Sequence, residues 1–111
     1  MNDVTVFRAL ASELRLQLFS LTLRRPYCVQ ALARVTGLTE SAISQQMRIL
    51  REAELVTAVK HGYHTHFIAD RKRLTAALGR FAEQAEQVHF DADACGCRES
   101  DKQCLCGEVV K

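Results

Sequence analysis

The chain has 111 residues, of which 48% are hydrophobic and only 6% aromatic, so its size allows one domain with a modest aliphatic core. No run of about 18 apolar residues occurs, and the first ten residues place an acid before their single cation, so neither a spanning helix nor a secretory signal is indicated. We therefore expect a cytoplasmic protein without a membrane partner. Five cysteines, an odd number, argue against a purely disulfide framework.

The net charge of +2 is unevenly distributed along the chain. Residues 1–90 carry 12 Lys and Arg against 8 Asp and Glu, whereas residues 91–111 carry 3 against 5. We expect a folded domain over residues 1–90, followed by a cysteine-rich tail over residues 91–111. A basic body of this kind is compatible with a nucleic-acid partner.

Two helices are expected at the start of the chain. Residues 1–10 have amphipathic helical spacing. Ser12 is placed to cap a second helix over residues 13–23, whose leucines surround most of its circumference and predict a central position. Pro26 ends this helix, since proline cannot continue it.

The next 28 residues predict a helix-turn-helix. Residues 28–35 and 39–55 each have apolar positions at helical spacing, and Thr36-Gly37-Leu38 between them reads as a tight turn. Thr39 is a good N-cap for the second helix. The polar face of that helix carries short hydrogen-bonding side chains and one cation: Glu40, Ser41, Ser44, Gln45 and Arg48.

This polar face suits a helix that lies in the major groove of DNA. Ser and Gln can read base edges there, and Arg can bind a guanine or a phosphate. The alternative is a pair of packed helices in an all-α domain with no ligand. The residues that follow favour the first interpretation.

After Leu55 the hydrophobic period changes from 3.6 to 2, which predicts a β-hairpin with its turn at Lys60-His61-Gly62. A basic hairpin directly after a recognition helix is the wing of a winged helix. Lys60 and His61 at its tip could contact the DNA backbone. The expected fold is therefore mainly α with a β-hairpin wing, a winged helix-turn-helix.

Asp70 is expected to cap the last predicted helix, which carries a heptad seam. The seam residues are Leu74, Leu78, Phe81, Ala85 and Val88. Packing against a second copy of the chain is the simplest use of such a seam, and packing back on the same domain is the alternative. A homodimer would place two recognition helices about one DNA turn apart, so the operator should be an inverted repeat of double-stranded DNA.

Four thiols fall within twelve residues of the tail, at Cys95, Cys97, Cys104 and Cys106. In a reducing compartment this density indicates soft-metal binding or redox chemistry. Four thiolates satisfy tetrahedral Zn or Cd, and three satisfy a pyramidal centre such as trivalent arsenic or antimony. The C-x-C spacing disfavours a structural zinc knuckle. A thiol switch and a tail without function stay open as alternatives.

Other candidate ligands are less distinctive. Cys28 is either a small apolar residue or a further ligand, which would need a tail thiol to reach it. His64 and His66 share one face of the predicted wing and could chelate, although polar residues of a half-exposed hairpin explain them as well. His89 could join Asp91 or Asp93 in a zinc site between paired helices.

Three segments together resemble the ArsR/SmtB family of dimeric, metal-sensing winged-helix repressors. These are ALASELRLQLFSL, YCVQALARVTGLTESAISQQMRILREAELV and KHGYHTHF. The resemblance implies an apo-dimer that blocks transcription from operator DNA and leaves it when a ligand binds. It also places Gln46 on the recognition helix, where Gln45-Gln46 stand in place of the Arg-His of many members. The full set of expected DNA contacts is Thr39, Ser41, Ser44, Gln45, Gln46, Arg48, Lys60 and His61.

The resemblance also bears on the ligand. Arsenic-sensing members commonly have Cys-Val-Cys where this chain has Cys28-Val29-Gln30 and keeps one thiol. Other members place arsenic ligands just after the last helix, and Cys95, Cys97 and Cys104 resemble that arrangement, with Cys106 extra. Cadmium and lead sensors pair a helix cysteine with thiols from elsewhere, so Cys28 with the tail stays open.

We therefore expect a repressor released by arsenite or antimonite. The alternatives are a Cd-, Pb- or Zn-responsive repressor, a thiol-redox-switched repressor of the same fold, and a metal-buffering or structural Zn module without a regulatory role. The sequence does not predict an enzyme, because it has no phosphate-binding glycine loop, no paired catalytic carboxylates and no Cys–His pair in a nucleophile context.

Overall fold

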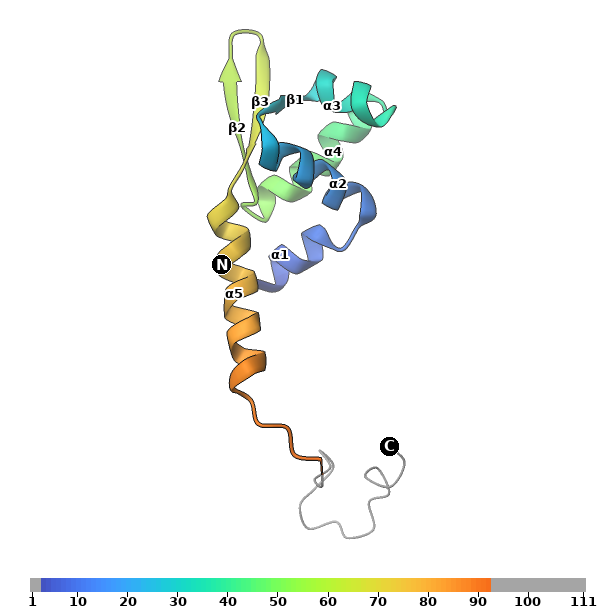
Figure 1. The fold of residues 1–111 in the computed structure, drawn as a ribbon. Coiled ribbons are helices and arrows are strands. Elements are labelled where there is room, and N and C mark those ends of the chain that lie inside the picture. The colour runs from blue at the N-terminus through green and yellow to red at the C-terminus, as the bar shows by residue number, and fades with distance from the viewer. Residues whose placement is uncertain (1–2, 93–111) are drawn as a thin grey trace. The chain divides into compact units, whose positions relative to one another are not determined.

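The computed structural model describes residues 3–92 (Figure 1). It divides into two units, Met1–Phe81 and Ala82–Lys111, and helix α5 crosses the boundary between them. The elements in chain order are α1 (Asp3–Leu10), α2 (Glu13–Arg24), β1 (Tyr27–Cys28), α3 (Val29–Thr36), α4 (Glu40–Glu52), β2 (Val56–His61), β3 (His64–Ala69) and α5 (Arg71–Gln87). None of the described helices has both the length and the apolar character needed to cross a bilayer.

The helix ends lie where local side-chain chemistry predicts them. The Ser12, Thr39 and Asp70 side chains each accept a hydrogen bond from a backbone N–H three residues later, at 3.3, 3.1 and 3.0 Å. Gly37 ends α3 in the left-handed conformation, with φ of 76°, and its N–H donates to the Ala33 carbonyl. All three predicted caps are confirmed, and the Thr39 cap fixes the residue at which α4 begins.

The wing differs from the expected hairpin in two ways. The sheet has three strands in the order β1-β3-β2, because Tyr27 and Cys28 pair with Phe67 and His66. The hairpin turn is Gly62-Tyr63, with His61 paired to His64. The prediction that Lys60 and His61 lie at the tip is therefore wrong, because both belong to β2. The first position of such a turn needs a positive φ, and Gly62 supplies it with a φ of 64°.

One apolar core holds the helices against the inner face of this sheet. Its largest fully buried side chains come from α1, α2, α3 and α4 and from the residue just before β2: Val6, Leu18, Phe19, Leu32, Ile43, Met47, Leu50 and Leu55. Ile43, Met47 and Leu50 follow one another at helical spacing, so the core holds α4 along a single stripe. The opposite side of α4 is thereby left to solvent.

Helix α5 buries little of its seam in the first unit. Ala77 is buried and Leu74 is half-buried, but Leu78 and Phe81 are 48% and 62% exposed. The helix ends at Gln87, so Val88 of the predicted seam lies just beyond it.

Candidate nucleic-acid interface

The solvent-facing side of α4 carries four of the predicted DNA contacts. Ser41, Ser44, Gln45 and Arg48 are all exposed. Positions 41, 44, 45 and 48 recur at helical spacing, so their side chains share one face, opposite the buried stripe. None of the four side chains makes a hydrogen bond or ion pair with another side chain in the described part of the chain. This face is therefore a row of unused donors and acceptors on a rigid helix.

Two other predicted contacts on α4 already have partners. The Thr39 hydroxyl accepts the Ala42 N–H at 3.1 Å as the helix cap. Gln46 is half-buried, and its Oε1 accepts a hydrogen bond from Arg15 Nη1 at 2.9 Å. The structure therefore gives both residues a role inside the fold.

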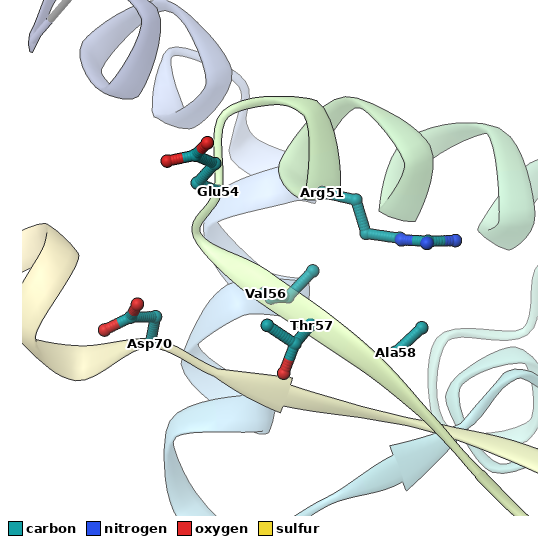
Figure 2. A pocket seen from close by; sticks show the side chains of 6 residues that line it. All are labelled: Arg51, Glu54, Val56, Thr57, Ala58 and Asp70. Carbon is teal, nitrogen blue, oxygen red and sulfur yellow. The ribbon is translucent and has the colours of Figure 1, made fainter. Parts of the chain in front are cut away.

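Arg51 extends the polar face and was not among the residues singled out from the sequence. It lies one turn beyond Arg48, is exposed, and lines a hollow of about 460 Å³ between the end of α4 and the start of the wing. Figure 2 shows its side chain reaching out over β2, with Asp70 at the far end of the hollow. The i, i+3 spacing from Arg48 was the signal that could have identified it.

The wing supplies a second exposed surface. Lys60 and His61 are exposed near the end of β2, and Tyr63 at the turn is fully exposed. The ring of His61 packs edge-on against that of His66, with centroids 5.8 Å apart. His66 Nδ1 is buried and has no hydrogen-bond partner within residues 3–92.

Cys28 lies at the N-cap position of α3 and is half-buried. It borders a hollow of about 210 Å³ that His64 and Glu40 also line. Across residues 3–92, no group of three His, Cys, Asp or Glu side chains is arranged to hold a metal ion, so Cys28 and the wing histidines do not form a site by themselves. The predicted ligands Cys95, Cys97, Cys104 and Cys106, and Asp93 of the alternative site with His89, lie outside the described residues.

Comparisons with known proteins agree with this geometry. A family model described as "Bacterial regulatory protein, arsR family" matches residues 12–58, which run from the cap of α2 into β2. The curated protein "Transcriptional repressor SmtB homolog" from Synechocystis is 41% identical over 61 residues, which are 55% of this chain and 46% of that protein. The match thus spans about half the length of the relative.

Solved structures extend the likeness to most of the fold. One described as "Possible transcriptional regulator for arsenical resistance" has a TM-score of 0.62 and 31% identity, over 69% of this chain and 80% of its own. The "homodimeric winged helix-turn-helix DNA-binding domain" Mb0332 from Mycobacterium bovis has a TM-score of 0.63 at 23% identity, over 78% and 81%. The fold is a winged helix-turn-helix, and the family is one of regulators and not of enzymes. The chain belongs to the arsR family of bacterial regulatory proteins.

Proposed function

We propose that this protein is a transcriptional repressor that binds double-stranded operator DNA as a homodimer and leaves it when arsenite or antimonite binds its thiols. The observation that carries the DNA-binding part is the exposed polar face of α4, held rigid by the buried stripe on the opposite side. Ser, Gln and Arg side chains that have no side-chain partner within residues 3–92 are suited to base edges and phosphates. The relative from Synechocystis is named a transcriptional repressor.

Within this face we assign different roles to different residues. Ser41, Ser44 and Gln45 would read bases, while Arg48 and Arg51 would bind guanine or phosphate. From the wing, Lys60, His61 and Tyr63 would contact the backbone and fix the register of the helix on the duplex.

The proposed dimer is supported by apolar side chains of α5 that are largely exposed in the first unit. Leu78 and Phe81 on α5 are 48% and 62% exposed. Phe7 and Phe81 stack edge to face with centroids 5.9 Å apart, so these apolar groups belong to one surface. A second copy would cover this surface, and the two-fold axis would require an inverted-repeat operator. The Mycobacterium bovis structure is described as homodimeric.

The ligand part depends on the sulfur content of residues 91–111, which we treat as a segment distinct from the winged domain of residues 1–90. Cys95, Cys97 and Cys104 supply the three thiolates that trivalent arsenic or antimony requires, with Cys106 and Cys28 as further donors. A solved relative of this chain is described as a possible regulator for arsenical resistance. Because the thiols must lose protons to bind, the response should weaken at low pH.

The experiment begins by selecting bound duplexes from a random DNA pool with the wild-type protein under reducing conditions. Affinity for the enriched duplex is then measured by fluorescence anisotropy with arsenite, antimonite, Cd, Pb or Zn added. We expect arsenite or antimonite to weaken binding by about 5- to 150-fold, the usual range of a coupling between two sites. Unchanged affinity at saturating metalloid would contradict the proposal.

Single Cys→Ser variants at the five positions then identify the ligands. Loss of the response in the Cys95, Cys97 and Cys104 variants, with Cys28→Ser unchanged, supports a site built from the tail. Loss of the response in Cys28→Ser points instead to a site that pairs Cys28 with tail thiols, as in the cadmium and lead sensors. Release by a mild oxidant but by no ion would identify a thiol-redox switch.

A further inference from the structure

Arg15 of helix α2 holds two other helices at once. Its Nε donates a hydrogen bond to the Ala9 carbonyl oxygen of α1 at 2.6 Å, and its Nη1 donates to Gln46 Oε1 of α4 at 2.9 Å. Arg15 and Gln46 are half-buried and Ala9 is buried, so solvent competes little for these bonds. We propose that Arg15 is a positioning residue that fixes the recognition helix relative to α1, a proposal that rests on the DNA-binding function above.

The chemistry of both acceptors explains why an arginine is found here. Ala9 lies in the last turn of α1, where carbonyl groups have no partner within the helix and the helix dipole is negative. The guanidinium group can only donate, so it must meet the oxygen of the Gln46 amide and not its nitrogen. A lysine ammonium lacks the planar fork that points two donors in fixed, separate directions. Arg15 is therefore matched to this pair of acceptors in shape as well as in charge.

From its first residue onward, α1 is also tied to α5. The Asp3 carboxylate accepts hydrogen bonds from Arg80 Nε and Nη2 at 2.8 and 2.7 Å, and Arg73 Nη1 lies 3.6 Å from the same group. The Phe7–Phe81 ring contact adds an apolar link between the same two helices. Helix α1 thus has α5 bound to one part of it and, through Arg15, the recognition helix bound to another.

This arrangement gives a continuous set of contacts from the proposed dimer surface to the DNA-reading face. A change in how α5 and α1 pack against a second copy would shift the Ala9 carbonyl, and Arg15 would pass that shift to Gln46 and α4. Gln46 then acts through the placement of its helix and not by reading a base. Its loss should weaken binding to every sequence alike, whereas loss of a base-reading residue changes the sequence preference.

The test compares Arg15→Met and Gln46→Leu with Arg71→Met. The control removes a similar bond, because Arg71 Nη2 donates to the Leu23 carbonyl at 2.9 Å, but that bond does not reach α4. On the duplex selected by the wild-type protein, we expect Arg15→Met and Gln46→Leu each to bind about tenfold more weakly, as for the loss of one charge-assisted hydrogen bond. The double variant should be no weaker than either single variant, since both remove the same contact. Arg71→Met should bind like the wild type.

Two further readouts separate positioning from a general loss of stability. Gln46→Glu can still accept the hydrogen bond from Arg15, so this variant should bind with wild-type affinity. Single-base changes in the duplex should weaken binding of Gln46→Leu and of the wild type by the same factor. Normal affinity of Arg15→Met alongside a severe loss in Arg48→Ala would overturn the inference and leave the DNA-binding function intact.

Amide hydrogen exchange of the DNA-free protein tests the inference even if the wild-type protein selects no duplex, which would refute the proposed function. Exchange in the middle of α4 should be faster in Arg15→Met than in wild type and Arg71→Met. Equal exchange in all three proteins would overturn the inference.

Discussion

Helices α4 and α5 differ in what they leave exposed. Helix α4 buries a complete apolar stripe and presents hydrogen-bonding side chains to solvent, whereas α5 buries only Ala77 and leaves Leu78 and Phe81 uncovered. A rigid polar face suits a polar partner, and an uncovered apolar face on a helix tied to its own core suits another apolar face. The contrast leads us to expect DNA at α4 and a second copy at α5, and each of the following predictions challenges one side of it.

The largest effect is expected from a charge on the apolar face. Leu78→Glu should raise the dimer dissociation constant at least 100-fold, because a carboxylate would be buried without a partner in the proposed interface. The monomer fold should persist, since Leu78 is 48% exposed in the first unit. Sedimentation velocity gives the mass and circular dichroism the helix content, with Thr75→Glu, an exposed position on the same helix, as the control.

The next largest effect tests the polar face. Arg48→Ala should weaken operator binding by about 5- to 150-fold, the range for one bidentate base contact or a strong phosphate contact. Thermal stability should stay unchanged, because Arg48 is exposed and has no partner among the described residues. Anisotropy titration at two salt concentrations distinguishes the two kinds of contact, since only loss of a phosphate contact lowers the salt dependence by about one unit of slope. Equal binding by Arg48→Ala and wild type would show that this face does not meet DNA.

A smaller effect is expected where α4 meets the wing. Glu54 has a φ of 62°, the left-handed conformation that costs a side-chain-bearing residue about 1–2 kcal/mol. Glu54→Gly should therefore raise the free energy of unfolding by about 0.5–1 kcal/mol, part of the relief being offset by glycine's extra freedom in the unfolded chain. Urea denaturation measures this, and Glu52→Gly, at the last residue of α4, should have the opposite sign.

The smallest effect concerns pH and the link between α1 and α5. The hydrogen bond from Arg80, helped by its charge and that of Arg73, holds the pKa of Asp3 below its usual value of 3.8. A lowered pKa means that the link contributes stability above pH 3.8 and loses it as the pH falls through the lower value of the folded state. Compared with Asp3→Asn, the wild type should show an additional loss of stability only below about pH 4. Identical acid unfolding profiles would show that the pair contributes nothing.

Much of the fold was predictable because its signals are local. Ser12, Thr39 and Asp70 each bond to a backbone N–H three residues away, so neighbouring residues alone specify these helix starts. The strand β1 was missed because two residues carry no periodicity, and only pairing with β3 makes them a strand. The turn was predicted too early in the chain, because the residues on either side of Gly62 can both form a turn with it. The pairing of His61 with His64 shows that Tyr63 is the second turn residue.

The candidate site divides in the same way. The sequence alone determined which side of α4 is polar, because a helix with apolar residues on one stripe must expose the other side once that stripe is buried. Only the tertiary structure decided that Gln46 bonds to Arg15, since these residues are 31 positions apart and no local pattern relates them. Long-range contacts of this kind depend on how helices cross in the core, and that geometry follows from packing the whole set of buried side chains together.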